Sequence, residues 1–294
     1  MKSSFFSNNF FKVIIFTRQF FYLLLFFLVN LTPLNKAFAQ VFTFDYLTYH
    51  ANSSVPSKPR SYTATPYIFF GTNEFDAQGN SSSNNINYKE YHIHFAFALN
   101  FKEKIQLAIV PQVGLLSAKG FSSTTGGDIW FLGKYQFLKQ PAIAFRLGFK
   151  LGKIGKSIWL KQNDFDIGLV TKTQLPGLEI GGVVSYRIRG KSEFDLLDFA
   201  GRFNEPGNAF HYKFELSKKI RQKFSVSMFL LGYVSASKKR DGIKLADSNS
   251  RKTTVGAAVK IRTSGDRSYK VGVLADAVGK HDKKGVAVVF SLSK

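Results

Sequence analysis

The 294-residue chain contains no cysteine, which excludes a disulfide framework, a zinc site with Cys ligands and a cysteine nucleophile. Acidic residues are scarce: 19 Asp and Glu stand against 41 Lys and Arg, which gives a formal net charge of +22. Hydrophobic residues make up 45% of the chain, far more than a disordered protein contains. The mean hydropathy of -0.07 is too polar for a bundle of transmembrane helices. It is compatible with a membrane β-barrel, in which every second strand residue faces lipid.

One long apolar run, Phe20–Val29, lies near the N-terminus. Three basic residues precede it, and the small-residue motif Ala37-Phe38-Ala39 follows it. This arrangement predicts a secretory signal peptide over residues 1–39, cleaved before Gln40. The alternative is an uncleaved N-terminal anchor, but the run is about half of the ~20 residues that a membrane-spanning helix needs. We therefore expect an exported protein.

From about residue 60 onward, apolar residues recur at every second position. In the segment 90–101, for example, Tyr91, Ile93 and Phe95 alternate with His92 and His94. We count twelve such segments, beginning near residues 61–71, and most carry charged residues on the opposite face. A half-buried strand in a soluble sandwich shows the same alternation, so alternation alone does not define the class.

The lengths of the connections are more informative, because short and long ones alternate along the chain. The short connections are Phe101–Lys104, Lys139–Pro141, Leu175–Gly177, Ile220–Lys223 and Thr263–Arg267. The long connections are Thr72–Asn85, Ser117–Gly127, Lys153–Asn163, Gly190–Asn208 and Ser235–Asn249. This order is typical of outer-membrane barrels, which have tight periplasmic turns and longer external loops. We predict an all-β fold over residues 61–294, a single up-and-down antiparallel transmembrane barrel of about twelve strands.

Two features of this prediction carry further expectations. Residues 40–60 fit a periplasmic lead-in, a plug inside the barrel or an additional strand, and the sequence does not choose among these. Aromatic residues near strand ends, Trp130 among them, are expected to form belts at the membrane interfaces.

The segment Gly126–Tyr135, followed by Pro141-Ala142, resembles a G-D-x-x-x-x-x-K-Y strand of the phenol meta-pathway family of outer-membrane transporters, which is similar to FadL-type channels. Arg146–Gly152 and Asp164–Gly168 stand where that family has its next two strands. The resemblance implies a twelve-stranded barrel and uptake of small organic compounds. One departure is the C-terminal residue, Lys294, where outer-membrane proteins commonly carry an aromatic residue.

The polar faces of the predicted strands would line the lumen. They carry nine basic residues, which we take as candidates for solute selectivity: Lys134, Arg146, Lys150, Lys172, Arg187, Arg189, Lys213, Lys260 and Lys270. Five acidic residues share these faces: Glu90, Asp166, Glu179, Glu215 and Asp276. Because charges in a narrow passage focus the electric field, an open lumen of this kind would favour anions. The alternative is that the charges pair across the strands and plug the lumen.

The long connections carry a second group of basic residues. Those expected to contact lipopolysaccharide phosphates are Lys153, Lys156, Lys161, Lys238, Lys239 and Arg240, with Lys252 in the same stretch of chain. The longest connection, Gly190–Asn208, has a Ser192 cap and apolar residues at helical spacing. It is expected to be either a short helix that gates the mouth or a surface loop.

We find no pattern that indicates catalysis, a metal site or a cofactor. His92 and His94 share one face, but no third ligand is evident, and a pair of polar residues in the lumen is the simpler interpretation. The high positive charge does not indicate nucleic acid in an exported protein. We therefore expect a non-enzymatic channel or transporter for passive uptake of small anionic or hydrophobic organic solutes, in the outer membrane of a Gram-negative bacterium. Its expected partners are outer-membrane lipid, lipopolysaccharide, the barrel-assembly machinery and small solutes. The alternative functions are a closed structural or adhesive barrel and, third, a lipid-modifying enzyme.

Overall fold

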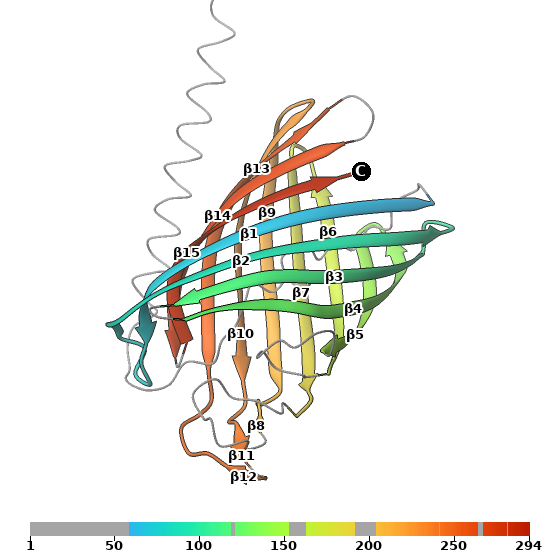
Figure 1. The fold of residues 1–294 in the computed structure, drawn as a ribbon. Coiled ribbons are helices and arrows are strands. Elements are labelled where there is room, and N and C mark those ends of the chain that lie inside the picture. Colours follow the sequence, from blue (N-terminus) through green and yellow to red (C-terminus); the bar gives the residue numbers. More distant parts are fainter. Residues whose placement is uncertain are drawn as a thin grey trace, which may run out of the picture.

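The computed structural model describes residues 59–118, 121–152, 163–191, 204–240, 242–263, 267–280 and 282–294. Within them, twelve long strands close into an antiparallel barrel (Figure 1). These strands are β1 (Arg60–Phe75), β2 (Ser81–Phe101), β3 (Ile105–Ala118), β4 (Phe121–Lys139), β5 (Ala142–Gly152), β6 (Asp164–Leu175), β7 (Leu178–Arg189), β9 (Ala209–Arg221), β10 (Phe224–Ser235), β13 (Arg251–Arg262), β14 (Ser268–Lys280) and β15 (Asp282–Ser293). The predicted fold class and strand number are confirmed. No helix of the described residues is long and apolar enough to cross a bilayer.

The barrel closes where β1 pairs with β15 on one side and with β2 on the other. Ile68 stands opposite Val288 across this seam, and the Tyr62 amide donates to the carbonyl of Lys294 over 2.9 Å. Closure leaves no strand edge with unpaired backbone groups. Both ends of the barrel chain, together with the short turns, therefore lie at one end, which we call the terminal end. We call the opposite end the loop end.

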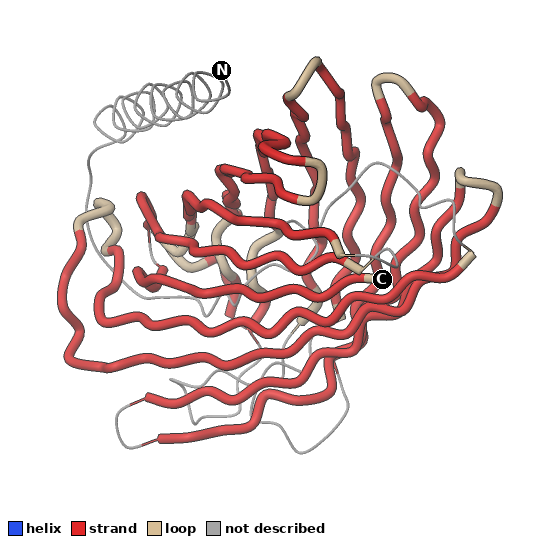
Figure 2. Tube along the Cα trace, turned by 90° about the horizontal axis from the view of Figure 1, so that it is seen from above, coloured by secondary structure: helices blue, strands red, loops and turns tan. Residues whose placement is uncertain are grey.

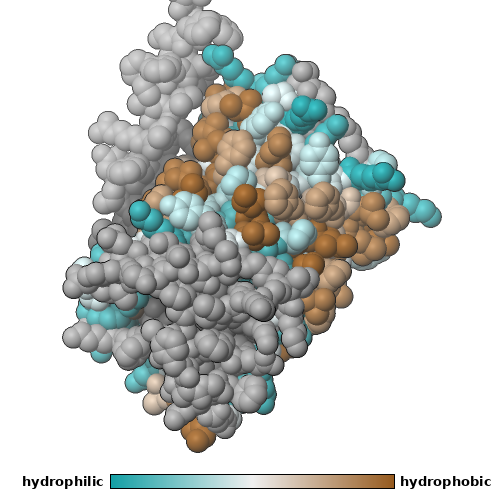
Figure 3. All heavy atoms as spheres, viewed as in Figure 1, coloured by the Kyte–Doolittle hydropathy of each residue, from teal (hydrophilic) through white to brown (hydrophobic). Residues whose placement is uncertain are grey.

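The outer surface is apolar because alternate residues face outward along each strand. In β6, Phe165, Ile167 and Leu169 are exposed, whereas Asp164 and Asp166 are buried inside. Figure 3 shows the outward residues as a broad apolar surface on the side of the barrel that it displays. A surface of this kind needs an apolar environment around it.

Two of the predicted long loops are largely strand. The connection between β1 and β2 shortens to the turn Asp76–Asn80, in which the Asp76 carboxylate accepts from the amides of Gln78 and Asn80 over 3.0 and 2.8 Å. Residues 117–127 likewise lie almost entirely within β3 and β4. Both segments are rich in Ser, Thr, Asn and Gly, and their sequences show no apolar alternation. The backbone ladder continues through them, because each backbone amide and carbonyl gains a partner in the neighbouring strand whatever its side chain.

A small second sheet lies at the loop end, where Figure 1 places it beyond the barrel. It consists of β8 (Asn204–Glu205), β11 (Lys239–Arg240) and β12 (Ile243–Lys244), in the order β12-β11-β8. Residues 192–203 of the longest connection lie outside the described residues, and so does the helix expected there. Figure 2, turned by 90° from the view of Figure 1, shows the long strands lying side by side.

Part of the barrel interior is apolar, which alternation did not predict. One cluster of buried side chains comes from the neighbouring strands β10, β13, β14, β15 and β1: Tyr67, Phe69, Phe229, Leu231, Ala258, Leu274, Ala287 and Val289. Trp130 is 7% exposed and packs inside with Val110, so the expectation that it lies in an interfacial belt is wrong. The reason is its register: it alternates with the outward-facing Phe131, which turns the indole into the lumen.

Candidate functional site

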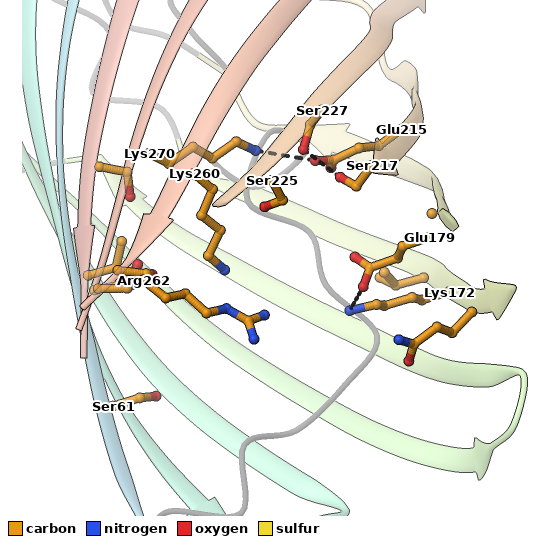
Figure 4. A pocket seen from close by; sticks show the side chains of 18 of the residues that line it. Ser61, Lys172, Glu179, Glu215, Ser217, Ser225, Ser227, Lys260, Arg262 and Lys270 are labelled. Carbon is orange, nitrogen blue, oxygen red and sulfur yellow. Dashed lines mark hydrogen bonds and ion pairs between the residues drawn. The ribbon is translucent and has the colours of Figure 1, made fainter. Parts of the chain in front are cut away.

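A cavity of about 810 Å³ occupies the terminal half of the barrel interior. Its wall is built from the inward-facing residues nearest the short turns, such as Glu179 early in β7 and Lys260 late in β13. Figure 4 shows Lys260 and Arg262 extending into this space from β13, with Lys172 and Glu179 on another part of the wall. We call it the basic cavity.

Basic side chains dominate the lining of this cavity. The described lining residues include twelve Lys and Arg side chains: Arg60, Lys134, Arg146, Lys172, Lys213, Lys219, Arg221, Lys223, Lys260, Arg262, Lys270 and Lys294. The side-chain carboxylates of the described lining are those of Glu179 and Glu215. Serine hydroxyls from β9, β10 and β15, including Ser217, Ser225 and Ser291, complete much of the polar surface. Such an excess of one sign in a confined space produces a positive potential that attracts anions.

Both carboxylates of the cavity are already engaged. Glu179 pairs with Lys172 at 2.7 Å, and Glu215 is shared between Lys213 and Lys270, the latter at 3.3 Å. Lys260 and Arg262 form no ion pair with any carboxylate of the described residues. The cavity therefore keeps a positive charge after its internal pairs are formed.

Beyond the cavity, toward the loop end, several charged side chains of the described residues are buried and paired. On one side of the barrel, Asp166 is fully buried and accepts from Arg146 Nη2 over 2.6 Å and from Arg187 Nε and Nη2 over 3.2 and 3.1 Å. Ser185 Oγ donates to the same carboxylate over 3.3 Å. The Arg187 guanidinium also lies 4.9 Å from the centre of the Trp130 ring, on a strand that is not a neighbour of β7. These contacts join side chains of four consecutive strands, β4, β5, β6 and β7, on the inner face of the barrel.

A second buried network lies on the other side of the same level. Lys252 Nζ contacts Asp276 at 3.0 Å and Asp282 at 3.8 Å, and Tyr233 donates to Asp282 over 2.6 Å. Thr254 donates to Asp276 over 2.7 Å. The sequence placed Lys252 in an external loop, but it belongs to β13 and points inward. We call the two networks, one centred on Asp166 and the other on Lys252, the packed layer. Trp130 and Tyr233 are its aromatic residues.

The structure divides the nine predicted lumen residues between the two levels. Lys134, Lys172, Lys213, Lys260 and Lys270 line the basic cavity, and Arg146 both lines it and binds Asp166 of the packed layer, whereas Lys150, Arg187 and Arg189 lie toward the loop end. Lys150 pairs there with Asp164 at 3.1 Å and with Asp128 at 3.6 Å. Six cavity residues at the terminal mouth were not among the predicted selectivity residues: Arg60, Lys219, Arg221, Lys223, Arg262 and Lys294. Most of them lie at turns or strand ends, and a count of basic residues beside the short turns would have found them.

The predicted histidine pair, His92 and His94, lies on the inner face of β2. His92 and His94 are each 2% exposed, and their ring centres are 6.1 Å apart. The Nε2 atom of His92 lies 3.5 Å from Glu90, and the Tyr67 ring lies 6.1 Å from the His92 ring. Among the described residues, no group of three or more His, Asp or Glu is arranged to hold a metal ion.

The basic residues expected outside the barrel are only partly described. Lys153, Lys156 and Lys161 lie outside the described residues. Lys239 belongs to the small sheet and lies 4.0 Å from Glu205, which pairs more closely with Lys191 at 2.9 Å. The hydrogen bond from Lys191 lowers the pKa of Glu205, with Lys239 adding to the effect. Lys238 and Arg240 flank Lys239 on the same segment.

The fold is similar to that of known outer-membrane channels. An outer-membrane channel from Pseudomonas putida F1 superposes with a TM-score of 0.71 at 10% identity, covering 87% of this chain and 99% of the other. The NanC porin gives a TM-score of 0.48 at 8% identity, with coverages of 79% and 97%. A FadL homologue from Pseudomonas aeruginosa gives 0.37 at 9% identity, with coverages of 80% and 88%.

No curated protein sequence matches the chain. A family model does: the family described as the putative MetA-pathway of phenol degradation matches residues 109–281, more than half of the chain. This range contains the strand segment Gly126–Tyr135 on which the sequence resemblance rested, so that resemblance is confirmed. A closed twelve-stranded barrel, the fold of an outer-membrane channel and the match over most of the barrel strands agree, and the chain belongs to this family.

Proposed function

We propose that this protein is an outer-membrane channel through which small solutes cross passively, and that it favours anions. The observation that carries the preference is the charge of the basic cavity, where the described lining has twelve basic side chains against two carboxylates. A permeating anion there meets a positive potential in a passage bounded by low-dielectric walls, which raises its local concentration and lowers that of cations. The apolar exterior and the family membership support the membrane location.

The proposal includes an orientation. With the termini and the short turns in the periplasm, as is usual for such barrels, the basic cavity opens toward the periplasm and the packed layer lies on the outer side. Lys238, Lys239 and Arg240 then lie at the outer surface, where lipopolysaccharide phosphates are available to them. The export signal over residues 1–39, its cleavage and insertion by the barrel-assembly machinery belong to the same proposal. The protein acts without catalysis, and the family's printed description makes organic acids derived from aromatic compounds reasonable solutes to test.

Single-channel recording tests the function directly. The full chain is expressed, the protein is purified from outer membranes, and its reversal potential is measured across a planar bilayer under a KCl gradient. We expect conductance steps with a reversal potential that shows chloride to be more permeant than potassium. A folded, heat-modifiable barrel that never conducts, or one that favours potassium, would overturn the proposal.

A charge-reversal variant links the preference to the cavity. Lys260→Glu combined with Arg262→Glu introduces four units of negative charge relative to the native cavity and should shift the reversal potential toward potassium. Lys244→Glu is the control, because Lys244 is exposed in the small sheet at the loop end. An equal shift in the control would assign the preference to the general charge of the protein instead of the cavity.

A further inference from the structure

One part of the cavity wall carries basic and hydroxyl side chains in two neighbouring rows. In the first row, Ser225 of β10 stands opposite Lys219 of β9 on one side and opposite Lys260 of β13 on the other. All three residues line the basic cavity. Side chains directly opposite each other on adjacent antiparallel strands have Cβ atoms about 4.5–5.5 Å apart. The hydroxyl of Ser225 therefore lies between two lysine positions, and all three groups can reach one anion.

The second row lies one step nearer the terminal end. Arg262 follows Lys260 by two residues on β13, about 6.6 Å along the strand, and it stands opposite Ser268 of β14. On its other side, the Arg262 amide donates to the carbonyl of Lys223 over 2.8 Å. Arg262, Ser268 and Lys223 all line the cavity. We call the residues of the two rows the terminal patch: Lys219, Ser225, Lys260, Lys223, Arg262 and Ser268.

The terminal patch contains hydrogen-bond donors and positive charge but no carboxylate. Among the described residues, none of its four basic side chains forms an ion pair with a carboxylate. The two side-chain carboxylates of the cavity lining, Glu179 and Glu215, pair with lysines outside the patch. Figure 4 shows Lys260 and Arg262 extending from β13 into the cavity. The patch thus presents its donors to the space in which a solute would lie.

From this arrangement we propose that the terminal patch binds a tetrahedral oxyanion that carries two charges, as phosphate monoesters do. Three terminal oxygens accept from Lys219, Lys260 and the hydroxyl of Ser225 at once, and the planar fork of Arg262 binds the same group from the second row. A carboxylate has one charge and only two oxygens, so it engages fewer of these donors. The donors come from the adjacent strands β9, β10, β13 and β14, and a single acidic group of the solute is therefore sufficient. The inference rests on the proposed function, because it names a class of solute for the same cavity.

Equilibrium binding tests this class without requiring current through the pore. The affinities of methyl phosphate, acetate and malonate for the purified full-chain protein in detergent are measured by titration calorimetry at constant ionic strength. The pH is held near about 8, above the second pKa of about 6 of a phosphate monoester. Methyl phosphate should bind about tenfold more tightly than acetate, and also more tightly than malonate, which carries its two charges on separate planar groups. A difference of less than about threefold from either acid would overturn the inference. Inorganic sulfate has the same shape and charge, so its failure to displace methyl phosphate would also overturn it.

A substitution that keeps the charge distinguishes the patch from the general potential of the cavity. Ser225→Ala should reduce the affinity for methyl phosphate by about fivefold or more, because one hydrogen bond to a charged oxygen is lost. The same variant should leave the chloride-to-potassium permeability ratio unchanged. The control is Ser61→Ala, which removes a hydroxyl of the same cavity on β1, outside the patch. If Ser225→Ala binds methyl phosphate as tightly as the Ser61→Ala control, the inference is refuted.

A substitution of the charge completes the test. Lys260→Gln should reduce the affinity for methyl phosphate by about tenfold, and Lys260→Arg should keep it within about threefold of the native value. Lys104→Gln, on the exposed turn between β2 and β3, is the control, and an equal effect there would refute the inference. If Lys260→Gln does not fold, Ser225→Ala decides alone. Chloride-selective current without a preference for methyl phosphate over malonate would refute the inference and leave the proposed channel in place. That preference without current would refute the channel and leave the binding site.

Discussion

The buried carboxylate of Asp166 offers the sharpest test of how the packed layer is held together. Asp166→Asn keeps the size of the side chain but removes the charge that faces two guanidinium groups. Asp166 is 0% exposed, while Arg146 and Arg187 are 5% and 7% exposed, so neither cation gains solvent when the charge is lost. Removing one partner of a buried ion pair costs about 3–5 kcal/mol, mostly because the remaining charge is left without compensation. Here one substitution removes the carboxylate from two buried guanidinium groups, so we expect a loss near the upper end of that range.

The measurement is the free energy of unfolding in lipid vesicles, from urea titrations followed by tryptophan fluorescence. The control is Glu103→Gln, because Glu103 pairs with Lys139 at a similar distance, 3.1 Å, with side chains that are 50% and 66% exposed. An exposed pair of this kind contributes about 0–1 kcal/mol. Combining Asp166→Asn with Arg187→Met should restore part of the loss, since one uncompensated cation is then absent. The reasoning is refuted if Asp166→Asn unfolds within about 1 kcal/mol of the native protein, or if Arg187→Met adds its full cost to that of Asp166→Asn.

Three further predictions concern other parts of the molecule. Gly256→Val should lower the free energy of unfolding by about 1–3 kcal/mol, because a Cβ there overlaps the ring of Phe229. When Phe229→Ala is added to this variant, part of the lost free energy should return in the same urea titration. In a carbon-13 NMR titration, Glu205 should show a pKa below the usual value of about 4.3, and Lys191→Ala should raise it. Since a lowered pKa stabilises the ionised form, this contribution of Glu205 is present above its unfolded pKa and is lost as the pH falls through its folded pKa. The proposed preference for anions should weaken between about 0.1 and 1 M KCl, because the Debye length falls from about 10 to 3 Å. If the reversal potentials give the same chloride-to-potassium permeability ratio over this range, the preference does not have an electrostatic origin.

Much of the barrel could be predicted because its apolar exterior and the lengths of its connections both produce patterns in the sequence. Outward residues such as Phe95 and Ile167 alternate with polar inward residues, and short turns such as Phe101–Lys104 alternate with longer connections. Both signals are local, and they are sufficient for the strand number and for the connection of each strand to the next.

The signal fails where both faces of a strand are apolar. All four residues of the stretch Met228–Leu231 of β10 are apolar, so alternation does not mark Phe229 and Leu231 as interior residues. The inward position of Lys252 was also missed. Lys252 follows a long connection that is rich in basic residues, and the sequence does not show where that connection ends and β13 begins. Its inward position depends on Asp276 and Asp282, which are distant in sequence and come close only when β13, β14 and β15 pair.

The two levels of the interior differ in how their charged side chains are arranged, and the sequence pattern does not separate them. The same face of β7 carries Glu179 in the cavity and Arg187 in the packed layer, so alternation alone could not distinguish a residue that meets solute from one that is locked to a neighbour. In the packed layer, Asp166 and Asp282 each hold side chains from different strands. In the cavity, the described lining has two side-chain carboxylates and twelve basic side chains, and on this excess we base the proposed anion preference. The charge pairs that would plug a lumen and the excess of basic residues on which we base the proposed anion preference therefore lie at different heights of one barrel.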